Sequence, residues 1–208
     1  MTYNAGDVSM WNEDESKVYN VVVLGDSRVG KSSLIFAFAI DTVPYKFIPS
    51  EFNDFPVEVE LGGEPVTLNI TNVTEIELLR YHCVPSTDVF IVLFSIDSRD
   101  SFQSAGKNWI PSIRKHFPTT PVILVGMKSD LRTTMTQEKY LSSLDKKIVP
   151  KQKAHRLARR FKRVKYIECS TTNAEEVRQV FRKAAKAVIN PKSADETMIS
   201  TQGSCGIM

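Results

Sequence analysis

Short apolar runs alternate with amphipathic segments along most of the chain. The first run, residues 18–24, is rich in Val and ends before Gly25, which is typical of a strand buried on both faces. We expect strands at 18–24, 57–61, 66–71, 88–95, 121–127 and 165–169. Other segments have helical character, and in one of them Phe102, Trp109 and Ile113 recur at helical spacing. These segments predict helices at 31–40, 101–117, 152–161 and 174–189.

The order of these elements predicts an α/β fold. Gly62-Gly63 between two strand-like runs is the signature of a hairpin. The remaining strands alternate with helices, which implies a mostly parallel sheet with helices on both faces. Ligands bind such sheets at the carboxyl ends of the strands, so functional residues are expected just after residues 24, 127 and 169. Polar composition predicts a disordered extension at 1–17 and a flexible tail at 190–208, leaving one domain over 18–189.

Composition narrows the class of protein. The chain has 208 residues, of which 42% are apolar and 25% charged, as in one ordinary globular domain with tails. The net charge of +3 gives no reason to expect nucleic-acid binding. Residues 1–17 lack the apolar core of a secretory signal, and no apolar run approaches the roughly 20 residues that span a bilayer. Three scattered cysteines favour a reducing compartment over a disulfide framework.

A phosphate-binding loop is predicted at residues 25–32. Their sequence, GDSRVGKS, matches G-x-x-x-x-G-K-[ST] and lies between an apolar strand and an apolar helix, which argues against a chance Gly-rich turn. Backbone N–H groups of such a loop wrap a phosphate, and the helix N-terminus adds partial positive charge. Lys31 is expected to reach the outer phosphates and the Ser32 hydroxyl to bind Mg²⁺. The other candidate contacts in the same segment are Asp26, Ser27, Arg28, Val29, Gly30 and Ser33.

A base-recognition site is predicted at Lys128 and Asp130, directly after the strand at 121–127. An Asp carboxylate there can accept hydrogen bonds from the N1 and N2 donors of guanine, which adenine does not offer. The stem of Lys128 would lie along the ring. A Lys–Asp pair in a loop is usually just solvated, but this position favours the base contact. Ser170 and Thr171 would complete the pocket through a backbone N–H.

Further motifs accompany these residues: Thr87-Asp88-Val89-Phe90, Ser101-Phe102, Trp109, the run 120–126 and Asp130-Leu131-Arg132. Together they resemble the Ras superfamily of small GTPases, and its Rho branch most closely. The resemblance covers about residues 19–189 and the last four residues. It implies a sheet of the P-loop NTPase type, GTP or GDP with Mg²⁺ as ligands, and an extra Rho-type helix within an insert at about 133–150, near 136–146.

The resemblance also implies a first switch loop at 44–52, with Tyr45 and Phe47. There Ser50 stands where the family has a Thr that binds Mg²⁺ and senses the γ-phosphate. A Ser keeps the hydroxyl, so Ser50 is a predicted Mg²⁺ ligand beside Ser32. The loop from Asp41 to Asn53 is then the expected contact surface for effector proteins.

The sequence departs from the family pattern where hydrolysis is carried out. The family's second switch begins D-T-A-G-Q-E, whereas residues 71–75 are Thr-Asn-Val-Thr-Glu and the segment is shorter. Asn72 replaces an Asp that helps hold Mg²⁺, and the Gly and the water-orienting Gln are missing. Ser27 stands where the family has a Gly beside the γ-phosphate. Val43 stands where it has an aromatic residue that packs across guanine, and Met127 where it has a Thr or Asn. We therefore expect GTP binding with very slow turnover, and we assign no catalytic residue.

Membrane attachment is predicted from the last four residues, Cys205-Gly206-Ile207-Met208, which have the C-a-a-X form that is prenylated at Cys. One prenyl chain anchors only marginally, so a second signal is expected. The basic stretch 151–165, with eight Lys or Arg and no acid, could contact anionic lipid, be a solvated helix face, or act in nuclear import. The expected location is the cytoplasmic face of the plasma membrane or endomembranes, with a cytosolic pool.

Two hypotheses of function follow. The first is a monomeric, membrane-anchored Rho-like switch that signals to the actin cytoskeleton and meets an exchange factor and a lipid-binding chaperone. The second is a pseudo-GTPase, a binding module of the same fold that does not switch with nucleotide.

Overall fold

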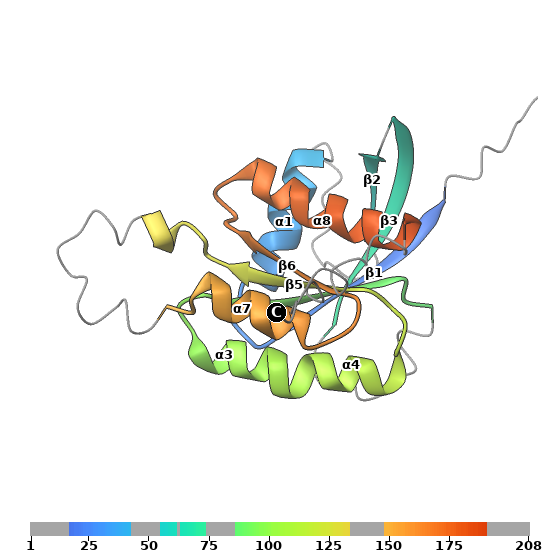
Figure 1. The fold of residues 1–208 in the computed structure, drawn as a ribbon. Helices are drawn as coiled ribbons and strands as arrows, with labels where there is room; N and C mark the ends of the chain where they lie inside the picture. Colours follow the sequence, from blue (N-terminus) through green and yellow to red (C-terminus); the bar gives the residue numbers. More distant parts are fainter. Residues whose placement is uncertain (1–16, 43–54, 62, 74–85, 134–147, 191–208) are drawn as a thin grey trace, which may run out of the picture.

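The fold is built on one six-stranded sheet, shown in Figure 1. It is seen in a computed structural model of the chain that describes residues 17–42, 55–61, 63–73, 86–133 and 148–190. The strand order is β2-β3-β1-β4-β5-β6, and only β2 runs antiparallel to its neighbour. The strands are β1 (Val18–Gly25), β2 (Phe55–Leu61), β3 (Glu64–Asn72), β4 (Val89–Ser95), β5 (Val122–Met127) and β6 (Val164–Cys169).

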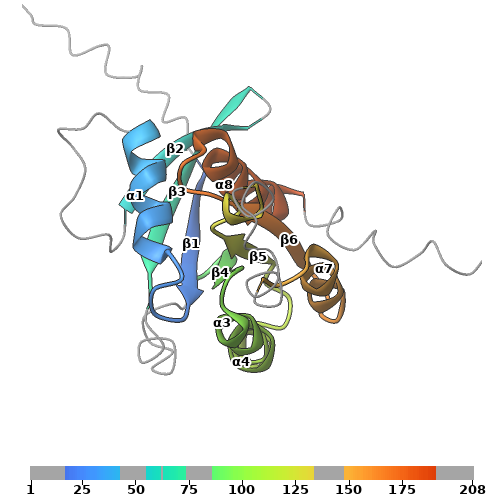
Figure 2. The same cartoon turned by 90° about the vertical axis from the view of Figure 1, so that its left-hand side faces the viewer.

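Helices cover both faces of the sheet (Figure 2). They are α1 (Lys31–Thr42), α3 (Arg99–Ser104), α4 (Ile110–His116), α7 (Lys151–Arg159) and α8 (Ala174–Ile189), with a π-helical segment, η2 (Ala105–Trp109), between α3 and α4. One core cluster joins α1 and α8 to the sheet, where the rings of Phe38 and Phe181 stack with centroids 3.9 Å apart. The other joins α3, η2, α4 and α7 to the opposite face. Strands β4 and β5 are fully buried, because both of their faces are covered.

The expected elements agree with this fold. Each strand and helix predicted within the described residues is present with bounds that shift by a few residues, and the hairpin joins β2 to β3. The segment expected to be a single helix at 101–117 is instead divided by the π turn at 105–109. The insert helix near 136–146 and most of the effector loop lie outside the described residues. Within the described part of the chain, no helix is long and apolar enough to cross a membrane.

The parallel strands align their carboxyl ends at one edge of the sheet. Gly25 of β1 pairs with Leu93 of β4, Ser95 of β4 pairs with Met127 of β5, and Met127 pairs with Cys169 of β6. Because β1, β4, β5 and β6 lie side by side in this order, the loops that follow these strands lie next to one another. This edge therefore brings together the two nucleotide-binding segments predicted from the sequence.

Candidate functional site

The predicted phosphate loop begins with a turn that requires glycine. Gly25 has φ +144°, and a Cβ on it would lie 2.5 Å from the carbonyl oxygen of Leu93. A side chain there would collide with the neighbouring strand, so the loop can leave β1 at this angle only with Gly. Gly30, at the other end of the loop, has φ +109°, which also favours glycine. The two glycines thus fix where the loop starts and where α1 begins.

Lys31 is held by the loop that precedes it. Its Nζ donates to the carbonyl oxygens of Gly25 at 2.7 Å and Asp26 at 2.9 Å. Partial burial lowers the pKa of Lys31 from its usual value, while the negative charge of Asp26 opposes this shift. These bonds fix the position of the ammonium over the loop, where an anionic phosphate group would meet it.

The start of α1 suits an anion. Its first turn contains no acidic residue, and the side chains of Ser32 and Ser33 are exposed there. The partial positive charge of the helix N-terminus is therefore not neutralised by a nearby carboxylate of the helix. Val29 packs into the core and supports the loop from below.

The residues present also fit a Mg²⁺ ion. The Ser32 hydroxyl is an accessible oxygen ligand at the helix start. Asn72 ends β3 at the same edge, and its buried Oδ1 accepts no hydrogen bond from any residue that the structure describes. Such a buried oxygen can accept a hydrogen bond from an ion-bound water. Ser50, the other predicted ligand, lies outside the described residues.

Asp26 directs its side chain away from the loop. Its Oδ1 accepts hydrogen bonds from the Ser104 hydroxyl and the Trp109 indole N–H, both at 2.7 Å. Of the predicted phosphate contacts in the loop, Asp26 can therefore offer only its backbone. The neighbouring Ser27 and Arg28 are exposed.

The predicted base-recognition loop is ordered by two acids, Asp97 and Glu176. Lys128 has φ +64° and its Nζ lies 3.2 Å from Oδ2 of Asp97, which follows β4. Burial opposes ionisation of Asp97, but hydrogen bonds from Ser95 and Lys128 outweigh it and hold the pKa of this carboxyl below its usual value. Glu176 of α8 accepts from the Ser129 hydroxyl and the Ser170 N–H, both at 2.8 Å.

Asp130 is joined to the loop that follows β6. Its Oδ1 accepts from the hydroxyl of buried Ser170 at 2.6 Å, and the carboxylate is itself exposed. The structure therefore brings together Asp130 and Ser170, which the sequence predicted as parts of one pocket. Since the Ser170 N–H is engaged by Glu176, Thr171 is the better candidate for the backbone donor. Burial, reinforced by the charge of Glu176, raises the pKa of the Cys169 thiol at the end of β6 to about 12.

An ion-pair cluster closes the chain after Asp130. Arg132 donates to both carboxylate oxygens of Glu168, at 2.6 and 2.8 Å, and to the carbonyl of Val149 at 2.8 Å. Lys151 and the Tyr166 hydroxyl also contact Glu168. Burial opposes ionisation of Glu168, but hydrogen bonds from Arg132 and Tyr166 outweigh it and lower its pKa. These contacts tie together the two ends of the predicted insert beside the base-recognition loop.

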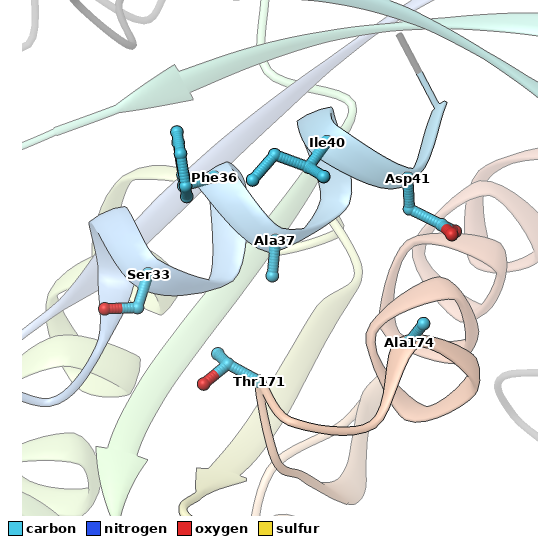
Figure 3. A pocket seen from close by; sticks show the side chains of 7 residues that line it. All are labelled: Ser33, Phe36, Ala37, Ile40, Asp41, Thr171 and Ala174. Atoms are coloured by element: carbon cyan, nitrogen blue, oxygen red, sulfur yellow. The ribbon is translucent and has the colours of Figure 1, made fainter. Parts of the chain in front are cut away.

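A shallow pocket lies next to this site, between α1 and the start of α8 (Figure 3). Phe36 and Ile40 stay 41% and 48% exposed along it. Arg178 of α8 forms an ion pair with Asp41 at 2.6 Å and fixes the end of α1. The pocket is lined by Ser33, Phe36, Ala37, Ile40, Asp41, Thr171 and Ala174.

Comparison with protein families gives one result: residues 20–190 match the family model described as Ras family. This chain belongs to the Ras family. Ras-family proteins are small GTPases that bind GTP or GDP with Mg²⁺ and act as GTP-binding switches. The match covers the phosphate loop, Lys128, Asp130 and the loop after β6, so the Ras-family domain includes every described site residue.

Several supporting residues escaped the sequence analysis. Asp97, Ser104 and Glu176 bind site residues but belong to no motif recognised in the sequence. Trp109 appeared only as a core position and a family marker. Pairs such as Asp26 and Trp109 are 83 residues apart, so only the fold shows that they meet.

The role of Glu176 can be tested by Glu176→Ala. This change leaves the Ser129 hydroxyl and the Ser170 N–H without their acceptor, which should lower the free energy of unfolding by about 1–3 kcal/mol. Amide hydrogen exchange should increase in residues 128–131 and 169–172. The matched control is Glu175→Ala, which removes an exposed acid from the same helical turn and should have a clearly smaller effect. Equal effects of the two variants would contradict this role.

Proposed function

We propose that this Ras-family protein is a GTP-binding signalling switch of the Rho branch that hydrolyses GTP very slowly and is anchored to membranes. The observation that carries the proposal is the joint placement of Lys31 and Asp130 at one edge of the sheet. Lys31 is directed by the carbonyls of its own loop, and Asp130 is positioned by Ser170.

Guanine specificity is supported by Asp130. Its carboxylate is exposed, yet one oxygen is fixed by a short hydrogen bond from a buried serine. A carboxylate at this place can accept from a base with two adjacent donors, as guanine has. Lys128, held by Asp97, would lie against the ring, and the Thr171 N–H would complete recognition.

Slow hydrolysis follows from what the described residues offer around the γ-phosphate position. Attack needs an oriented water and stabilisation of the developing charge, and bound Mg²⁺ supplies part of that stabilisation. Lys31 and Ser32 can contribute to charge stabilisation. Ser27 is exposed at the loop and would crowd an incoming arginine finger. Asn72 is a neutral amide, which holds an ion-bound water less strongly than a carboxylate does.

Assignment to the Rho branch rests on the sequence motifs around Asp88, Trp109 and Arg132. By that resemblance the protein would signal to the actin cytoskeleton through effectors that contact the loop from Asp41 to Asn53, and would meet an exchange factor and a lipid-binding chaperone. Prenylation of Cys205, which lies outside the described residues, would attach it to membranes.

The basic stretch 151–165 would supply the second membrane signal. Its exposed basic side chains project from α7 and the turn after it, whereas Arg163 donates to the Thr119 carbonyl at 2.7 Å. Each basic residue near an anionic surface contributes roughly 1 kcal/mol. The exposed basic residues are Lys151, Lys153, Arg156, Arg159, Arg160 and Lys162.

A pseudo-GTPase that does not switch is the second candidate. Buried Met127 favours it, because a thioether offers only a weak acceptor where the family has a hydrogen-bonding Thr or Asn. Its methyl group instead packs toward Gly30, where a Cβ would lie 3.5 Å from it. Met127 therefore offers the phosphate loop an apolar neighbour in place of a polar bond.

Asp130→Asn tests guanine recognition. Losing hydrogen bonds to a charged acceptor costs about 1.5–3 kcal/mol. The affinity for GTP should therefore decrease by a factor of about ten to more than a hundred. The affinity for xanthosine triphosphate should increase relative to that for GTP. Xanthine has a carbonyl where guanine has its amino group, and the Asn amide can donate a hydrogen bond to this carbonyl. The control Asp100→Asn, at an exposed site on α3, should leave both affinities unchanged. Undiminished GTP binding by Asp130→Asn would refute this base pocket.

Single-turnover release of phosphate from preloaded GTP tests the hydrolysis proposal. A Rho-type activating protein should change the rate of phosphate release little. In working enzymes an arginine finger accelerates this step by roughly 10³–10⁵-fold. Ser27→Gly alone should not restore the response, because the attacking water still lacks an orienting group. A clear burst of phosphate release when the activator is added to the unmodified protein would contradict the proposal and indicate an ordinary GTPase.

Cys205→Ser tests the membrane anchor. The variant should move from the membrane fraction to the cytosol, with no change in the denaturant midpoint of unfolding, because the substitution lies outside the domain at 18–189. Ser204→Ala is the matched control and should stay with membranes. A Cys205→Ser protein that still sediments with membranes would show that the basic stretch or a partner provides the anchor.

A further inference from the structure

The carboxylate of Asp26 lies against the π-helical segment η2 rather than in the phosphate loop. Ser104, the residue before η2, and Trp109, its last residue, both donate to the same oxygen, Oδ1, at 2.7 Å. Trp109 is only 4% exposed, so its N–H lies in a site from which most water is excluded. Among the described residues of the phosphate loop, Asp26 is thus the one whose side chain is hydrogen-bonded to a helix distant in sequence.

The π turn explains how one oxygen can receive both bonds. Ser104 and Trp109 are five residues apart, and at about 100° per residue an α-helix would direct them about 140° apart. In η2 the N–H of Ile110 instead bonds to the carbonyl of Ala105, the five-residue spacing of a π-helix, which brings such positions toward one face. π turns are rare and are frequently found at functional sites.

The position of η2 is itself fixed by packing. Ala105 and Trp109 belong to the core cluster under β4 and β5. On another side, a Cβ at Gly106 would lie 2.8 Å from a methyl group of Leu157 in α7, so the two segments are in close contact. The two donors are therefore presented by a rigid part of the domain.

We propose that Asp26 is a positioning residue for the phosphate loop. Bound to Trp109 and Ser104, its carboxylate fixes the start of the loop, and its carbonyl, with that of Gly25, directs Lys31. The inference rests on the proposed function, since the loop is positioned to receive a nucleotide phosphate. It also explains how an acid is tolerated beside an anion: its charge is turned toward two donors and away from the loop.

The test compares GTP dissociation rates of four variants of the full-length protein and one control variant. Asp26→Ala and Trp109→Phe should each release GTP faster by about tenfold or more, because a hydrogen bond to a charged acceptor is lost. Asp26→Asn should differ from the parent by no more than about threefold, since the amide oxygen can still accept both bonds. Combining Asp26→Ala with Trp109→Phe should add little, because both remove the same contact. Lys107→Ala, an exposed change within η2, is the control and should have no effect.

Two outcomes would overturn the inference. If Asp26→Asn and Asp26→Ala both bind GTP more tightly, the carboxylate acts by repelling phosphate and not by positioning the loop. If Trp109→Phe lowers only the free energy of unfolding and leaves GTP release unchanged, the contact is merely structural.

Amide hydrogen exchange separates this inference from the proposed function. If the parent protein binds no GTP, the proposed function fails. The positioning role of Asp26 is then tested by comparing the amide exchange rates of residues 25–31 between the parent and Asp26→Ala, both as purified. Faster exchange there in Asp26→Ala, beyond any change in the rest of the domain, supports positioning by Asp26. A uniform change, or none, overturns it.

Discussion

The whole site depends on how closely the phosphate loop leaves the sheet beside β4. At Gly25 the backbone of β1 lies so near the carbonyl of Leu93 that a single methyl group would collide with it. This close approach, together with φ +144°, turns the chain sharply and places the loop over the carboxyl edge. Parallel pairing of β1, β4, β5 and β6 then delivers the other loops to the same edge.

Short hydrogen bonds between loops complete what the sheet begins. Asp97, after β4, holds Lys128, after β5. Ser170, after β6, holds Asp130, and Glu176 of α8 binds both of these loops. Most of these contacts join residues that follow different strands, so the predicted base-recognition residues are placed by their neighbours rather than by their own loop alone. A nucleotide would therefore meet a preformed site.

The sequence was sufficient for the elements described and for the position in the fold of the two predicted binding segments. Apolar runs and helical spacing are local signals, and the G-x-x-x-x-G-K-[ST] motif has a fixed relation to its strand and helix. The side-chain orientation of Asp26 was not predictable, because it depends on a π turn with no local signature and on partners 78 and 83 residues away. Likewise, nothing near Glu176 indicated that it would hold Ser129 and Ser170.

The departures of the sequence from its family have different physical weights. Met127 loses a hydrogen-bonding group but keeps a packing contact toward Gly30, so nucleotide binding can persist. Asn72 keeps a buried oxygen but loses the negative charge that would hold an ion-bound water strongly. Ser27 would add bulk where an arginine finger needs room. Under the proposed function, these changes act on turnover more than on binding, and the protein would stay loaded with GTP.

The nucleotide content of the protein tests this account most directly. The protein is purified without added nucleotide and denatured, and the supernatant is separated by ion-exchange chromatography against nucleotide standards. The account predicts guanine nucleotide close to one molecule per chain, mostly GTP. Protein that carries no nucleotide would contradict GTP binding, and protein that carries only GDP would contradict slow hydrolysis.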